Sequence, residues 1–184
     1  EKQMLDAMKN HWKEYLIEAW GLGTFMVSAC VFGVVFFNSE SPLILLNPFI
    51  RNVLMGIAMG LTAIGIVLSP WGKRSGSHIN PSVTFTFWRL GKIKNWDAIF
   101  YIIFQFIGGT LGVLLSWLIL GKTLSDSMVN FVVTVPNNFG TSVSFVAEFV
   151  ISFVMMTMVL VTTNSAKLSR FTPLFAGFLV AIYI

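Results

Sequence analysis

Charged side chains are scarce in this sequence, and their scarcity excludes most classes of protein. Lys, Arg, Asp and Glu make up 11% of the 184 residues, whereas a soluble globular domain carries about 25%. Hydrophobic residues account for 55% of the chain. The composition therefore predicts an integral membrane protein surrounded by a lipid bilayer.

Cysteine and clustered reactive side chains are also missing. Cys30, inside an apolar run, is the single cysteine, which excludes an intrachain disulfide. The sequence contains no Ser/His/Asp, Cys/His or metal-ligand spacing. We therefore expect no enzymatic activity, no metal, no cofactor and no nucleic-acid partner.

Long apolar runs occupy most of the chain, and a membrane-spanning helix needs about 20 such residues. On this basis we predict four spans, over about 16–37, 49–69, 96–120 and 142–163. A fifth run begins at Phe171 and holds 14 residues up to Ile184, so we expect a span cut at its C-terminal side. Residues 1–15 predict an amphipathic helix at the membrane surface, and residues 121–141 a polar loop. The expected fold class is an all-α membrane protein.

One short helix is predicted between the second and third spans. Asn80 is a favoured N-cap residue, and Pro81 suits the first helical position because it has no N–H to leave unpaired. A helix from Pro81 to Trp88 is about 12 Å long, at about 1.5 Å per residue, and cannot cross a bilayer. We predict a re-entrant half-helix whose positive dipole end and Asn side chain point to the membrane interior.

The distribution of basic residues supports this topology. If the half-helix returns to the side from which it enters, one side of the membrane holds ten of the twelve Lys and Arg residues. These ten are Lys2, Lys9, Lys13, Lys73, Arg74, Arg89, Lys92, Lys94, Lys167 and Arg170, against Arg51 and Lys122 on the other side. Since basic residues accumulate in cytoplasmic loops, we expect a cytoplasmic N-terminus and a multi-pass protein of the plasma membrane, the inner membrane if the source is bacterial.

The chain also shows an internal repeat. Glu18 and Glu148 lie near the starts of two similar apolar spans, 130 positions apart. An odd number of spans separates the two units, so the second is inserted upside down, as in many transport proteins. We predict one domain over 1–184, with a first repeat at about 15–120 and a second, incomplete repeat at about 142–184.

The stretch around the half-helix resembles a known family signature. Residues 75–84 read Ser-Gly-Ser-His-Ile-Asn-Pro-Ser-Val-Thr. They are similar to the first Asn-Pro-Ala signature of the aquaporin, or major intrinsic protein, family, Ser-Gly-x-His-x-Asn-Pro-x-Val-Thr, with Ser82 where Ala is usual. The resemblance is to the bacterial type. It implies six spans and two half-helices in an inverted-repeat bundle, of which this chain holds five spans and one half-helix. A second Asn-Pro and a following Arg would lie beyond residue 184.

The resemblance also implies the residues of a pore. The expected pore-lining residues are Gly76, Ser77, His78, Asn80, Pro81 and Ser82. Carbonyl groups along the loop would accept hydrogen bonds and the Asn80 amide would donate them. A histidine such as His78 can act as a ligand or a base. In this motif we interpret it as supplying a carbonyl group to the pore and anchoring the loop by its ring. The expected structural buried polar residues are Glu18, Gln105 and Glu148; the two acids are interpreted as acceptors for loop N–H groups, with a proton relay as the alternative.

A selectivity filter is predicted at two further positions. In the family, one filter residue precedes a Gly-Leu-Ser/Thr sequence and another lies seven places after a Gly. Gly60-Leu61-Thr62 and Gly177 place Met59 and Ile184 there. Counting back from Asn80 selects Gly60 instead, so both Met59 and Gly60 are candidates. Either choice is less polar than the aromatic and His of water-selective members, which favours small uncharged solutes beside water.

The sequence therefore predicts a passive channel for water and small uncharged solutes such as glycerol, which excludes ions and protons. The resemblance implies a homotetramer with one pore in each subunit. Two alternatives are open: an inverted-repeat secondary transporter, and a weakly conducting structural or junction-forming member of the family.

Overall fold

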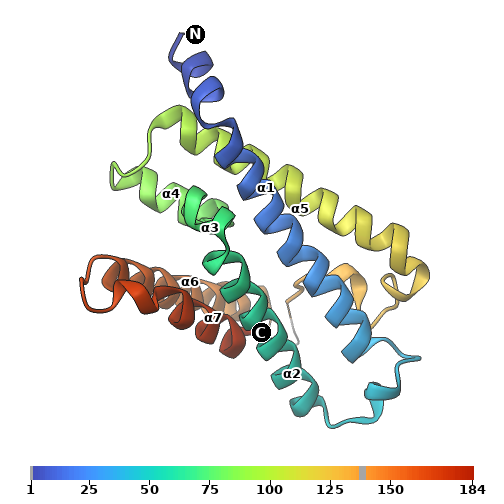
Figure 1. The fold of residues 1–184 in the computed structure, drawn as a ribbon. Coiled ribbons are helices and arrows are strands. Elements are labelled where there is room, and N and C mark those ends of the chain that lie inside the picture. Colours follow the sequence, from blue (N-terminus) through green and yellow to red (C-terminus); the bar gives the residue numbers. More distant parts are fainter. Residues whose placement is uncertain (1, 137–139) are drawn as a thin grey trace. The chain divides into compact units, whose positions relative to one another are not determined.

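The computed structural model describes residues 2–136 and 140–184, and all regular elements in these ranges are helical. Residue 1 and residues 137–139 of the predicted polar loop lie outside the described residues. In chain order the helices are α1 (Lys2–Phe37), η1 (Pro42–Leu45), α2 (Pro48–Leu68), α3 (Pro70–Ser75), α4 (Pro81–Arg89), α5 (Asn95–Leu120), η2 (Gly121–Thr123), η3 (Asn130–Val132), α6 (Thr141–Thr163), η4 (Ser169–Phe171) and α7 (Thr172–Tyr183) (Figure 1).

Within the described ranges, four helices are long and apolar enough to cross a bilayer. They are Lys2–Phe37, Pro48–Leu68, Asn95–Thr123 and Thr141–Thr163. The predicted all-α class and the four complete spans are thus confirmed, and the chain is an integral multi-pass membrane protein. The last helix, with its preceding turn, covers Ser169–Tyr183 and is shorter, so the fifth span stays a prediction.

Two segments differ from the sequence-based expectation. The predicted surface helix over 1–15 is not separate, because α1 runs without interruption from Lys2 to Phe37; no Pro interrupts this segment. The connection after α2 contains a helix, α3, that we did not predict. The Ser69 hydroxyl caps it by accepting a hydrogen bond from the Gly72 N–H at 2.9 Å, and Gly76 ends it in the left-handed conformation at φ 91°.

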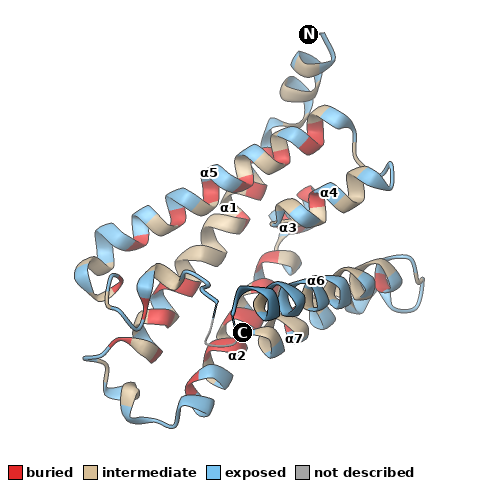
Figure 2. Cartoon of the chain, turned by 180° about the vertical axis from the view of Figure 1, so that it is seen from behind, coloured by how far each residue is buried: buried red, intermediate tan, exposed pale blue. Residues whose placement is uncertain are grey.

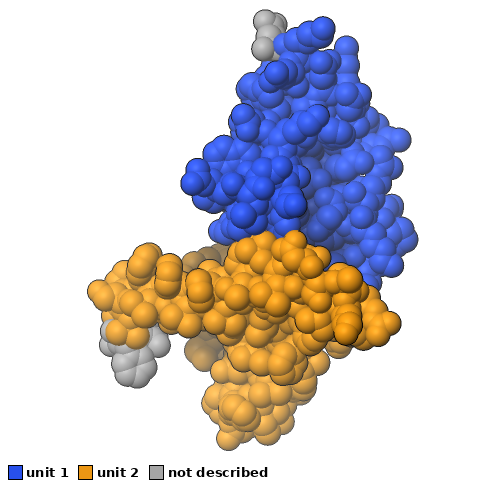
Figure 3. Space-filling view, turned by 90° about the vertical axis from the view of Figure 1, so that its left-hand side faces the viewer, with its two compact units in different colours: residues 1–30, 65–121 blue, residues 31–64, 122–184 orange. Residues whose placement is uncertain are grey.

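The chain forms two compact units, each described here by itself. Unit 1 consists of residues 1–30 and 65–121, and unit 2 of residues 31–64 and 122–184 (Figure 3). These bounds differ from those of the predicted repeats, since α1 and α2 each contribute to both units. The division into repeats and the single domain therefore stay predictions.

Unit 1 is built on close contact between α1 and α5, which run side by side in Figure 1. A Cβ added to Gly108 would lie 2.0 Å from the Ala19 carbonyl oxygen, and one added to Gly112 would lie 2.5 Å from the Gly23 carbonyl oxygen. Glycine is required here because the two backbones touch. The buried residues of α5 form one stripe along the helix (Figure 2). Helix α4 packs against α5.

In unit 2, glycines bring the backbones of α2 and α7 into the same kind of close contact. A Cβ on Gly56 would meet the Ala181 carbonyl oxygen at 2.1 Å, and one on Gly60 would meet the Gly177 carbonyl oxygen at 2.5 Å. Helix α6 packs against α7. In the loops of this unit, the Ser39 hydroxyl donates to Asp126 at 2.5 Å. This hydrogen bond, with one from the Met128 N–H, holds the pKa of the Asp126 carboxyl below its usual range.

Candidate functional site

The site begins as a strained turn between α3 and α4. Gly76, Ser77 and Ile79 have φ angles of 91°, 49° and 38°. Glycine adopts this left-handed region freely, but Ser and the β-branched Ile do so at a cost of about 1–3 kcal/mol each. The turn therefore needs support from its surroundings to persist.

The turn leads directly into the predicted short helix. Asn80 is the N-cap of α4, and its Oδ1 accepts a hydrogen bond from the Ser82 N–H at 2.8 Å. Helix α4 runs from Pro81 to Arg89, one residue longer than predicted, so a helix too short to cross a bilayer is present. Its re-entrant position in a membrane stays a prediction. Asn80 and Ser82 are exposed, while Pro81 is half-buried.

The support for the turn comes from Glu18 on α1. Its carboxylate is 0% exposed and accepts four hydrogen bonds. Oε1 accepts from the Ser75 hydroxyl at 2.7 Å and the His78 N–H at 3.1 Å. Oε2 accepts from the Ile79 N–H at 2.6 Å and the Gln105 side chain at 2.8 Å. One acid thus satisfies two part-buried backbone N–H groups that no helix or sheet satisfies.

A second set of hydrogen bonds fixes His78. Gln105 Nε2 also donates to the Thr84 hydroxyl at 3.0 Å, and Thr84 Oγ1 lies 3.1 Å from His78 Nδ1. The His78 ring stacks on Phe87, with centroids 4.9 Å apart. Sequence reasoning missed Thr84, although its position four residues after the N-cap Asn80 places it on the first turn of α4.

Tyr101 on α5 completes the support. Its hydroxyl donates to the Ser75 carbonyl at 2.7 Å, and its ring meets the His78 ring edge-on at 5.3 Å. Sequence reasoning missed both Tyr101 and Ser75. A signal was present for Tyr101, since it lies four residues before Gln105 and so shares its face of α5.

The supported turn presents polar groups that are free for a ligand. Among the described residues, no hydrogen bond uses the carbonyl groups of Gly76, Ser77 or His78. The Asn80 side chain is exposed beside them at the positive end of α4. Such a row of acceptors with one donor suits small uncharged molecules that carry hydroxyl groups. No cluster of three metal-ligating side chains occurs in the described part of the chain.

The remaining predicted residues belong to unit 2. Glu148, expected to be a buried polar residue, is exposed on α6, and its role as a hydrogen-bond acceptor stays a prediction.

The three filter candidates lie in unit 2. Met59 is 1% exposed and Ile184 is 46% exposed. Gly60 lies in the contact between α2 and α7, where a side chain would meet the Gly177 backbone. Gly60 stays an alternative to Met59 as a filter residue, although helix packing also explains its glycine, so Met59 is preferred.

Comparison with known proteins gives a consistent result. The chain is 29% identical over 163 residues to aquaporin Z of Photorhabdus laumondii, covering 85% of this chain and 68% of that one. It is 32% identical over 131 residues to a probable aquaporin, AqpM, of Archaeoglobus fulgidus (71% and 51% covered) and 32% identical over 116 residues to aquaporin-5 of Mus musculus (62% and 42%). The match thus spans between 42% and 68% of the length of these relatives. A model of the major intrinsic protein family matches residues 5–184, and the chain therefore belongs to that family.

Proposed function

We propose that the protein is a passive channel for water and small uncharged solutes such as glycerol. Membership of the major intrinsic protein family supports transport rather than catalysis, and the matched relatives are aquaporins by name. The observation that carries the proposal is the capped half-helix, with exposed Asn80 at its N-terminus and a turn held by the buried Glu18.

The proposed pore-lining residues are those of the turn and the start of α4. Permeating molecules would exchange hydrogen bonds with the free carbonyl groups of Gly76, Ser77 and His78 and with the Asn80 amide. Because the N-terminus of α4 carries positive dipole potential, cations and protons would be disfavoured there. Pro81 and Ser82 form the first turn of α4 beside Asn80.

Selectivity is assigned to Met59 and Ile184. Both side chains are apolar, and neither donates a hydrogen bond, so the proposed filter accepts glycerol-sized uncharged solutes as well as water. We further propose that the protein is a homotetramer in the plasma membrane. Its N-terminus would be cytoplasmic, and the ten-to-two distribution of basic residues supports this orientation.

The secondary-transporter alternative is less well supported by the site. A proton relay needs an acid that can release its hydrogen-bond partners, whereas Glu18 is fully buried and accepts from four donors. Water and glycerol fluxes that ignore applied ion gradients would favour the channel, and gradient-driven accumulation would favour the transporter. Normal assembly without measurable flux would favour the structural or junction-forming role.

Asn80→Asp tests the channel directly. Aspartate is also a good N-cap, so the protein should fold and assemble, but the added negative charge replaces the amide donor at the positive end of α4. In proteoliposomes we expect water flux to fall severalfold and a cation leak to appear. Asn52→Asp, the same change at an exposed position of α2, is the control. Unchanged water flux and no leak in Asn80→Asp would contradict the proposed role.

A further inference from the structure

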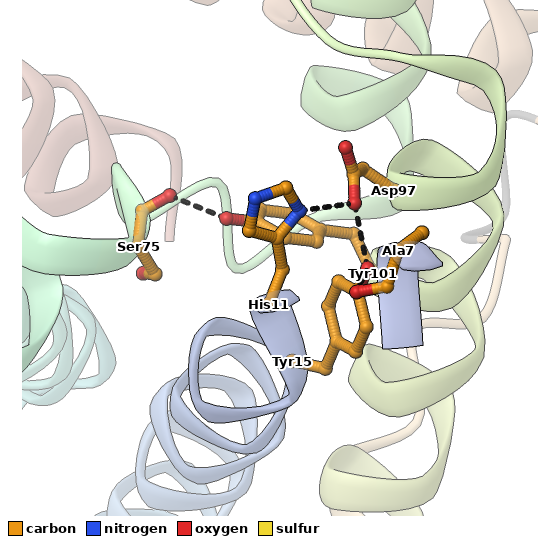
Figure 4. Close-up of polar contacts among 6 residues, drawn as sticks. All are labelled: Ala7, His11, Tyr15, Ser75, Asp97 and Tyr101. Atoms are coloured by element: carbon orange, nitrogen blue, oxygen red, sulfur yellow. Dashed lines mark hydrogen bonds and ion pairs between the residues drawn. The ribbon is translucent and has the colours of Figure 1, made fainter. Parts of the chain in front are cut away.

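A chain of contacts in unit 1 connects the supported turn to the start of α5 (Figure 4). It begins at Tyr101, whose hydroxyl holds the Ser75 carbonyl at 2.7 Å. On its other side, the Tyr101 ring meets the Tyr15 ring edge-on, with centroids 5.8 Å apart. Tyr101 therefore contacts the turn and Tyr15 at once.

From Tyr15 the chain continues to an ionisable pair. The Tyr15 side chain is 0% exposed, and its hydroxyl donates to Asp97 Oδ1 at 2.6 Å. The same oxygen lies 2.8 Å from His11 Nδ1. Asp97 is largely buried, whereas the His11 side chain is 45% exposed. The Tyr15 hydroxyl has a second acceptor, the Ala7 carbonyl, at 3.1 Å. Asp97 thus joins an exposed imidazole to a buried phenol.

His11 is open to solvent through a cavity of about 460 Å³ between the first turns of α1 and the start of α5. Polar side chains surround it, so water and protons can reach the imidazole. Among the described residues, the charged groups that face or adjoin His11 are Asp6 and Glu14 of α1, Lys94 and Asp97 at the start of α5, and Arg74 of α3, which pairs with Glu14 at 2.8 Å.

We propose that Asp97 is a positioning residue for the turn at Ser75 to Asn80. Protonation of His11 strengthens the hold of Asp97 on this turn and increases permeation through the channel. This inference rests on the proposed channel function. Asp97 does not contact the proposed pore-lining residues; it acts through Tyr15 and Tyr101 on the Ser75 carbonyl.

The sign follows from the charges of the pair. Imidazole groups commonly change charge between about pH 5 and 8. A protonated His11 attracts the Asp97 carboxylate as an ion pair, while a neutral one offers a hydrogen bond alone. The stronger pair holds α1 against α5 and keeps Tyr15 packed on Tyr101. A partly exposed ion pair can shift a balance between two states by about two- to fivefold, and we expect an effect of that size.

The test is water permeability of proteoliposomes at about pH 5.5 and about pH 8, on either side of the usual imidazole transition. For the unmodified protein we expect the ratio of the two permeabilities to be about two to five. His11→Gln keeps a donor toward Asp97 but cannot be protonated, and Tyr101→Phe removes only the hydroxyl that holds Ser75. Both should bring the ratio to about one, although Tyr101→Phe leaves the His11–Asp97 pair in place. Lys9→Gln, an exposed position of α1, should keep the original ratio.

Each contrary result identifies a different error. A ratio of one in the unmodified protein overturns the inference. A pH effect that survives His11→Gln assigns it to another group, such as His78, and also overturns it. If Tyr101→Phe keeps the ratio, the route through Ser75 is wrong. Absence of permeability at both pH values would contradict the channel function instead. In that case amide hydrogen exchange of residues 76–80, corrected for intrinsic rates, still decides: we expect severalfold slower exchange at the lower pH, and equal protection overturns the inference.

Discussion

The two units share a packing device but differ in how they treat an acidic residue. In both, glycines let helix backbones touch, between α1 and α5 in unit 1 and between α2 and α7 in unit 2. Glu18 in unit 1 is fully buried, whereas Glu148, its counterpart in the predicted repeat, is exposed. Glu18 is buried beside a strained turn whose His78 and Ile79 N–H groups donate to it, as the cost of placing an acid within a membrane helix requires.

The largest expected effect comes from neutralising Glu18. In Glu18→Gln the new NH₂ group faces donors instead of accepting from them, which leaves two part-buried N–H groups unpaired. The loss of stability should be about 2–6 kcal/mol, at about 1–3 kcal/mol for each unsatisfied group. Glu148→Gln, the matched control, should change stability by less than about 0.5 kcal/mol. Thermal unfolding in detergent measures both, and equal losses would contradict the distinction between the acids.

The shared packing device is tested by adding one methyl group. In Gly108→Ala the new Cβ would lie 2.0 Å from the Ala19 carbonyl oxygen, so the backbones must separate. We expect a loss of about 1–3 kcal/mol. Gly65→Ala is the control, because nothing lies within 4 Å of a Cβ at that position, and alanine favours the helix. A Gly108→Ala protein as stable as Gly65→Ala would show that the contact between α1 and α5 is looser than described.

The proposed division of labour between the units predicts a change in selectivity. Met59→Phe adds bulk at the proposed filter in unit 2 and changes no residue of the Glu18 network, which belongs to unit 1. Glycerol uptake should therefore fall severalfold more than water uptake in proteoliposomes. Leu61→Phe, at an exposed position of the same helix, should leave the ratio of the two fluxes unchanged. Equal reductions of both fluxes by Met59→Phe would remove Met59 from the filter.

The smallest effect is expected at Asp126, an acid in the loops of unit 2. The hydrogen bond from Ser39 is the main cause that lowers the pKa of Asp126. Its contribution to stability is present above the ordinary carboxyl pKa and is lost as the pH falls through the lowered pKa. Ser39→Ala should raise the Asp126 pKa toward about 3.9, as measured by NMR titration of the carboxyl group. A pKa that does not move would assign the shift to the Met128 N–H instead.

Much of the fold followed from the sequence because the signals are local. The second, third and fourth spans, the N-cap at Asn80 and the half-helix from Pro81 were predicted to within a residue of the helices observed. The first span ends at Phe37 as predicted, but its helix begins at Lys2 rather than near residue 16. Helix α3 was missed although Ser69, Pro70 and Gly76 are recognised start and stop residues. A six-residue helix has too little hydrophobic periodicity to be noticed between two longer ones.

The site was harder to predict because its partners are distant in the chain. The binding of Glu18 to the turn could be predicted because burying an acid within a membrane costs free energy unless hydrogen-bond donors pair with it. The roles of Thr84 and Tyr101 depend on which face of α4 meets which face of α5, and a single sequence does not contain that information. The role of Glu148 stays a prediction, because the repeat pattern identifies equivalent positions but not the contacts that each of them makes.

The glycine contact between α1 and α5 has a mechanical consequence. Where carbonyl oxygens lie directly against Cα atoms, as at Gly23, Gly108 and Gly112, no side chain is available to change rotamer and absorb a displacement. We therefore expect α1 and α5 to move together at this contact rather than slide past one another. Motion near the turn then requires changes in the hydrogen bonds around it, while the contact between α1 and α5 stays fixed.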